Sequence, residues 1–309
     1  MDRPGRPLGL LIAALAGLAG SIALGAGPRP TLQALTWIAP GREATALARQ
    51  PATCLAAAAD DPQVESGMAL FNSPQLLGGQ AARAGVSCAS CHSNGRRNVD
   101  FQLAVVSDGP GTADVSQSFF SVARGNRRFD PKPIPDLALP GKISRNPGSS
   151  ALTTFLHGLI VEEFSGREPG EAALADLAAY VRAIQACPSR SEQARSVSDQ
   201  LALFRASVRG AARASAAGDP QSANVLIGGA RWQLGLIDER LAPFGHASER
   251  KALLRTSREL QTILDETKKP PRLNALLTKF DRTTAPALGK AEARSLYREV
   301  LVRRWLAGR

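Results

Sequence analysis

The sequence is poor in the residues that most often bind metals or react with substrates. Its 309 residues include only four cysteines, three histidines and two methionines. Residues 189–309 contain no cysteine, no catalytic-triad pattern and no glycine-rich phosphate loop, so this part of the sequence indicates no enzyme chemistry. Beyond residue 26 no apolar run is long enough to span a bilayer, and we therefore expect a soluble body.

The one long apolar run lies at the amino terminus. Arg3 and Arg6 precede an uncharged stretch over residues 8–26, which is typical of a secretory signal. The run is also about long enough to cross a membrane, although its many glycines and alanines make it weakly hydrophobic. We expect residues 1–27 to be a signal peptide or a retained anchor and residues 28–53 to be a linker. The protein would then be periplasmic, either free or tethered to the inner membrane through residues 8–26.

Three of the scarce residues stand together. Cys88-Ala89-Ser90-Cys91-His92 has the C-x-x-C-H spacing of covalent haem attachment. Two cysteines at this spacing can each bond to one porphyrin, which leaves the following histidine under the iron as proximal ligand. The alternative is a disulfide or half of a zinc site, but Cys54 and Cys187 have no further ligand near them to complete a zinc site. The motif predicts one covalently attached haem c with its iron on His92.

The two remaining cysteines flank the motif at a distance. In an oxidising compartment, an even remainder of thiols predicts one disulfide, between Cys54 and Cys187. Such a bond would close a long loop and contribute about 4 to 5 kcal/mol in the chain-entropy model. The alternative is two unrelated thiols. The disulfide would join the two ends of a compact unit over residues 54–188.

Two amphipathic segments lie near the ends of that unit. The first begins at Asp61 with a proline at its first helical position, and the second begins near residue 168 and is expected to stop at Pro188. Gly67 and Phe71 on the first and Tyr180 on the second would let the two helices cross closely, because glycine leaves room for a ring.

These residues resemble a known family. The segments 67–71 (GMALF), 76–79 (LLGG) and 86–92 (VSCASCH) resemble the opening of a haem domain in the bacterial cytochrome c peroxidase family. Residues 176–182 are similar to the last helix of cytochrome c domains. The resemblance covers residues 54–188 and implies a small all-helical cytochrome c fold. Well-known members carry two haem motifs, whereas this chain carries one, so their di-haem mechanism would need a second haem from a partner chain.

The ligand on the far side of the iron has few candidates. Met68 precedes the motif, and an apolar packing role suits it better than ligation. His157 follows the motif, in the stretch where cytochrome c folds wrap the distal side, and is the leading candidate. If neither binds, peroxide could reach the iron, and Glu162 and Glu163 are the nearest candidates for an acid or base. Their alternative role is a solvated helix edge.

The chain between the motif and His157 is rich in glycine, proline, asparagine and aspartate. This composition predicts a long irregular wrap around a haem edge. Haem propionates need positively charged partners when they are partly buried. The candidates in this wrap are Arg124, Arg127, Arg128 and Lys142.

Residues 189–309 have a different character. Leucines and isoleucines recur at helical spacing, and breakers fall at 218–220, 243–245, 269–271 and 285–286. The pattern predicts an antiparallel bundle of four or five helices, and the whole chain is predicted to be all-α. This half carries most of the net charge of +11. A basic surface could dock an acidic redox partner or lipid headgroups, or could simply be solvated; an exported protein is not expected to bind nucleic acid.

Together these features predict a mono-haem c-type cytochrome that transfers electrons in the periplasm. Two alternatives remain. One is a peroxidase-like haem enzyme that acts at an open sixth iron position, and the other is a haem-based ligand sensor whose bundle relays occupancy.

Overall fold

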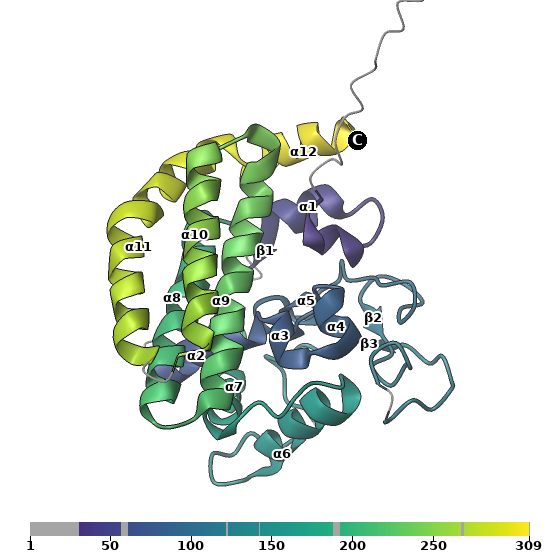
Figure 1. Cartoon of the computed structure of the whole chain (residues 1–309). Coiled ribbons are helices and arrows are strands. Elements are labelled where there is room, and N and C mark those ends of the chain that lie inside the picture. The colour runs from purple at the N-terminus through teal and green to yellow at the C-terminus, as the bar shows by residue number, and fades with distance from the viewer. Residues whose placement is uncertain are drawn as a thin grey trace, which may run out of the picture.

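The computed structural model describes residues 31–56, 61–121, 123–141, 143–187, 192–266 and 269–308. In these ranges the chain is mostly helical, with two short two-stranded sheets, so the predicted all-α class is confirmed (Figure 1). None of the helices in these ranges is both long and apolar enough to cross a membrane. The predicted signal or anchor, residues 1–27, lies outside the described residues.

Part of the stretch expected as a linker is folded. It contains η1 (Gln33–Thr36), α1 (Glu43–Ala48) and β1 (Arg49–Pro51). Strand β1 pairs antiparallel with β4 (Glu192–Ala194), and α1 packs against α12 (Glu299–Ala307). The stretch therefore contacts the carboxyl-terminal half of the chain.

The region around the haem motif is built from short elements and loops. Its longest helices are α2 (Pro62–Phe71), α6 (Ala151–Gly158) and α7 (Glu171–Ala183). Between α2 and α6 lie α3 (Pro74–Leu77), α4 (Gly79–Arg83), α5 (Cys88–Cys91), η2 (Ser93–Gly95), β2 (Thr112–Ala113) and β3 (Lys132–Pro133), and the π-helical turn η3 (Leu159–Glu163) follows α6.

Helix α2 forms and packs as its sequence predicts. The Asp61 carboxylate accepts a hydrogen bond of 2.8 Å from the Gln63 amide, and Pro62 occupies the first helical position. α2 crosses α7 at Gly67, where a Cβ atom would lie 1.9 Å from the Asp176 carbonyl oxygen. The rings of Phe71 and Tyr180 meet at a centroid distance of 5.1 Å. The expected close crossing is confirmed.

The two ends of this region are joined. Helix α7 ends at Ala183, earlier than expected, because Ile184 is extended and forms a β-bridge with Leu55. A disulfide bond links Cys54 to Cys187 just beyond that bridge. The end of α7 is thus set by pairing with the start of the region and not by Pro188.

The carboxyl-terminal half is a bundle of long helices, coloured green to yellow in Figure 1. Ser196 caps its first helix through a capping box, and Asp219 caps the second. The expected break at Pro286 is wrong: the last long helix continues through this proline, with Ala285 and Leu288 buried on either side of it. The elements are α8 (Val197–Ala216), α9 (Pro220–Leu241), η4 (Ala242–Phe244), α10 (Ala247–Leu264), α11 (Lys269–Ala291), η5 (Glu292–Arg294) and α12.

The two halves share one hydrophobic core. Helix α2 packs directly on α8, where Gly210 leaves room for Ser66: a Cβ atom at 210 would lie 2.4 Å from the Ser66 hydroxyl oxygen. Arg213 of α8 donates hydrogen bonds to Ser66 at 2.9 Å and to Asp176 of α7 at 3.3 Å. Arg213 of the bundle therefore links α2 and α7, of which the first precedes and the second follows the haem motif in the sequence.

Candidate functional site

The haem motif forms a single helical turn, α5. Ser87 and Ser90 form a capping box at its start, in which the Ser87 amide donates to the Ser90 hydroxyl at 3.0 Å. The His92 amide donates to the Cys88 carbonyl at 2.9 Å, which closes the turn. Asn98 donates its side-chain amide to the Ser90 carbonyl at 2.7 Å. These bonds fix Cys88, Cys91 and His92 at one edge of α5.

Both motif cysteines are free thiols in the structure and are half-buried. They pack against the main hydrophobic core. Burial raises the pKa of Cys88 to about 12, and the pKa of Cys91 is raised for the same reason. The thiols are therefore neutral and available, in apolar surroundings that would suit a porphyrin face.

His92 has the protonation state of a metal ligand. Its Nδ1 lies 3.0 Å from the carbonyl oxygen of Pro135. A carbonyl only accepts hydrogen bonds, so Nδ1 carries the proton and the Nε2 lone pair is free. Burial lowers the pKa of His92 to about 4, against a smaller opposing effect of the hydrogen bond to Pro135. The imidazole is neutral at pH 7, as iron ligation requires.

The carbonyl that orients His92 is itself held in place. Arg96, four residues after His92, pairs with Asp136 at 2.8 Å, and its Nε lies 2.9 Å from both carboxylate oxygens. The Leu137 amide donates to the Gly95 carbonyl at 3.0 Å. Pro135 thus lies in a loop that is bonded on its carboxyl side to the segment after the motif.

A buried tyrosine near the motif has an unsatisfied hydroxyl. Tyr180 is fully buried, its hydroxyl has no partner, and its ring packs on Phe71, which lies 6.4 Å from the His92 ring. A buried hydroxyl without a hydrogen bond is costly, so a group that accepts a hydrogen bond from it fits this place. Burial and the nearby Cys88 both raise the pKa of Tyr180, so it stays a donor. The residues present fit a covalently attached haem.

Each of the two candidates for the sixth iron ligand, His157 and Met68, makes other contacts within the protein. His157, on α6, bonds through Nε2 to the Glu168 carboxylate at 2.8 Å, and its side chain is 40% exposed. Ligation would have to displace Glu168 or use Nδ1. Met68 lines a cavity together with Ser87, Ala89 and Ser90 of the α5 segment. Its side chain is half-buried and packs on the core, in keeping with an apolar packing role.

The candidate acids and the first candidate propionate partner contact one another. Arg124 binds Glu162, with its Nε 2.8 Å from the carboxylate, and also Glu163 at 3.0 Å. Its positive charge is therefore shared between two carboxylates. Arg127 and Arg128 are exposed in the following loop, Arg127 with a left-handed backbone. Lys142 lies outside the described residues.

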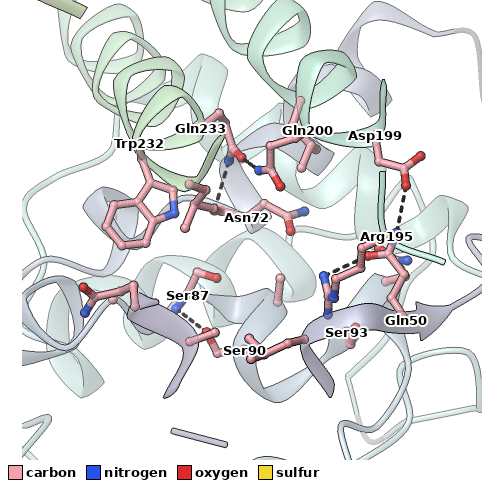
Figure 2. A pocket seen from close by; sticks show the side chains of 18 of the residues that line it. Gln50, Asn72, Ser87, Ser90, Ser93, Arg195, Asp199, Gln200, Trp232 and Gln233 are labelled. Atoms are coloured by element: carbon pink, nitrogen blue, oxygen red, sulfur yellow. Dashed lines mark hydrogen bonds between the residues drawn. The ribbon is translucent and has the colours of Figure 1, made fainter. Parts of the chain in front are cut away.

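Sequence reasoning missed a cavity of about 310 Å³ on the other side of α5. At 100° per residue, Ala89 and Ser90 face away from Cys88 and Cys91, so the cavity lies behind the haem-binding edge. Figure 2 shows Ser87 and Ser90 on one wall, with Trp232, Gln233 and Gln200 opposite them. No sequence pattern could have indicated it, because its lining comes from residues 33 to 240.

Comparisons with protein-family models, with curated proteins and with solved structures found no match. Across the described ranges, no group of three or more histidine, cysteine, aspartate or glutamate side chains is placed to hold a metal ion.

Proposed function

We propose that the protein is a mono-haem c-type cytochrome that carries electrons in the periplasm. The observation that carries this proposal is the state of His92, whose Nδ1–H is held by the Pro135 carbonyl, which leaves the lone pair on Nε2, in a motif whose two cysteines are free thiols. Cys88 and Cys91 would anchor the porphyrin and His92 would bind its iron. A bound haem supplies one-electron oxidation and reduction.

The remaining features support export and electron transfer. A disulfide between Cys54 and Cys187 suits an oxidising compartment, where c-type haem motifs are also found. The excess of basic residues in the bundle half supports an acidic redox partner that is attracted electrostatically. The Arg96–Asp136 pair holds the loop whose Pro135 carbonyl orients His92, and it would limit movement of this ligand if a bound iron changed its charge.

The test is expression with a c-type haem maturation system, followed by denaturation and measurement of haem that stays bound to the chain. We expect one covalent haem per chain. The double variant Cys88→Ser with Cys91→Ser should lose it, whereas Cys54→Ser with Cys187→Ser should keep it, because that pair forms the disulfide. A wild-type chain that matures without covalent haem would contradict the proposal.

A peroxidase-like reaction is the second candidate, and the surroundings of the sixth-ligand candidates favour it. His157 is held by Glu168, and Met68 lines the cavity behind α5. An iron without a protein sixth ligand would be high-spin and would bind peroxide or carbon monoxide. Spectra of the ferric and ferrous protein decide: low-spin iron in both states supports electron transfer, and a His157→Ala variant with an unchanged spectrum removes that histidine as the ligand.

A further inference from the structure

We propose that the cavity behind α5 binds a neutral hydroquinone and that the haem receives its electrons. This inference rests on the proposed function, because it names the electron donor of that haem. The cavity opens between the haem-motif segment and the bundle, and its volume of about 310 Å³ suits a single substituted ring.

The position of the cavity fits electron donation. Ala89 and Ser90 line it from the α5 side, and Cys88 and Cys91 lie on the opposite edge of the same helical turn. A ring in the cavity would be separated from a haem on those cysteines by the thickness of one helix, about 10 Å with its side chains. An electron can cross that distance without contact between the ring and the porphyrin.

The charges around the cavity favour a neutral ligand. Arg195 and Arg240 line it together with Asp199 and Glu239, so positive and negative side chains balance. Arg240 is committed to the protein: it donates to the Leu296 carbonyl and, at 2.9 Å, to the Leu47 carbonyl, and it stacks on Tyr297. The cavity therefore has no cluster of like charges that would bind a ligand of the opposite charge.

The uncharged lining offers donors for the oxygens of a ring. Trp37 lines the cavity, and its buried indole N–H has no partner. Gln200 and Gln233 also line the cavity; Gln200 donates to the Gln233 side-chain oxygen and Gln233 to the Asn72 carbonyl at 3.4 Å, so only the second N–H of each amide is left for a ligand (Figure 2). An unsatisfied buried donor favours a ligand that brings an acceptor. Phenolic hydroxyls both donate and accept hydrogen bonds. The indole rings of the lining can pack against the apolar ring that carries these hydroxyls.

Oxidation of a hydroquinone also needs a proton acceptor. Glu239 faces the Gln33 amide, which donates to it at 2.8 Å, and its charged neighbours are Arg240 and Asp238. Burial raises the pKa of Glu239 to about 7, against smaller opposing effects of Gln33 and Arg240. The carboxylate can therefore take up and release a proton near neutral pH.

The two O–H bonds of the hydroquinone would break and the quinone would be released, while a haem held by Cys88, Cys91 and His92 would accept the two electrons one at a time. The redox partner protein would oxidise that haem again between the two transfers. One proton passes to Glu239 and then to water, and the other passes directly to water.

The test uses methylhydroquinone and the holoprotein under anaerobic conditions. We expect the rate of ferric haem reduction to saturate with hydroquinone concentration. Ala202, an exposed residue of α8 in the cavity lining, is replaced by Trp to fill the entrance. Ala202→Trp should lower the second-order rate constant about tenfold and abolish calorimetric binding of the oxidised quinone. Ala216→Trp, at an exposed position on the same helix outside the lining, should behave like the wild type.

Different results would overturn the proposed function and the cavity inference. A chain that lacks covalent haem overturns the proposed function. A haem protein that Ala202→Trp leaves equally fast, with no saturation, overturns the cavity inference alone, because the reductant then reacts at the haem edge. Binding of a neutral sugar without binding of the quinone would also overturn the assigned ligand class.

Discussion

The bundle and the haem-motif region satisfy their buried backbone in different ways. Helices α8 to α11 contain between 18 and 23 residues each, and most of their amides bond within the helix. In the described chain between η2 and α6, the only regular elements are the two-residue strands β2 and β3. There, side chains replace regular structure as hydrogen-bond partners.

Asp114 illustrates this second kind of organisation. It is buried, and its carboxylate accepts hydrogen bonds from the amides of Ser116 at 3.1 Å and Asp130 at 3.2 Å. Ser107 acts similarly, because its hydroxyl accepts from the Leu103 amide and donates to the Thr112 carbonyl at 2.7 Å. Irregular segments this long are uncommon in compact proteins unless they serve a function.

The two regions depend on different interactions for their stability. The bundle packs aliphatic and aromatic side chains from several long helices into the core that it shares with the haem-motif region. The loop-rich region has one disulfide and a set of polar contacts, and a porphyrin would complete its core. We expect perturbations of these two regions to differ in size and in the part of the chain that responds.

Removal of the disulfide should have the largest effect. The bond closes a loop with a sequence separation of 133, so Cys54→Ser with Cys187→Ser should cost about 4 to 5 kcal/mol in the chain-entropy model. Urea unfolding monitored by circular dichroism measures the loss, and limited proteolysis locates it. Cleavage should increase in residues 96–150 more than in the bundle. Equal cleavage of both regions would show that they unfold as one unit.

A bundle-core substitution is the matched perturbation of the other region. Phe204 is fully buried against Phe280, at a centroid distance of 4.5 Å. Phe204→Ala should cost about 3 to 5 kcal/mol in the free energy of unfolding, because it leaves a cavity. The control Phe244→Ala, at a residue 39% exposed, should cost less than about 0.5 kcal/mol. If Phe204→Ala instead exposes mainly residues 96–150 to protease, the bundle is not stabilised independently of the loop-rich region.

The two regions also differ in how much of their structure could be predicted from the sequence. Helices of the bundle follow from apolar spacing and from breakers such as Gly218-Asp219-Pro220, which precede or begin α9. The helix break predicted at Pro286 was wrong, because one missing backbone N–H does not end a helix whose neighbouring side chains are buried. The local geometry of α2 was readable for the same reason: its cap and its crossing glycine act within a few residues.

The sequence predicted only those parts of the site that lie within a few consecutive residues or that follow from the count of cysteines. The C-x-x-C-H motif is contiguous, and once it is set aside only Cys54 and Cys187 remain to pair with each other. The Pro135 carbonyl on His92 and the Glu168 carboxylate on His157 were not predictable, because they depend on how loops fold back over the motif. The cavity behind α5 combines three distant segments and has no sequence signal. The role of Arg124 as partner of two glutamates was missed for the same reason.

A smaller effect should follow from loosening the loop that orients His92. Asp136→Asn keeps the side-chain shape but removes the charge that pairs with Arg96. We expect a loss of about 1 to 2 kcal/mol in stability and a rise in the haem reduction potential, since a weaker Nδ1–H bond makes the imidazole a poorer donor to iron. Asp130→Asn, at an exposed pair with Lys132, should leave the potential unchanged. An unchanged potential in Asp136→Asn would show that Pro135 is held without this ion pair.

The last prediction concerns the contact between the two regions. Asp176 of α7 is 6% exposed and pairs with Arg213 of α8. Burial raises the pKa of Asp176 to about 6, against the opposing charge of Arg213. The folded state then binds this proton more tightly than the unfolded chain, so stability should fall as pH rises from about 4 to about 6. Asp176→Asn should flatten this part of the urea-midpoint profile, whereas Asp281→Asn, at the more exposed pair with Arg205, should preserve the fall. A wild-type midpoint that rises with pH over this range, or one that Asp176→Asn does not flatten, would mean that the regions are not coupled through this carboxyl group.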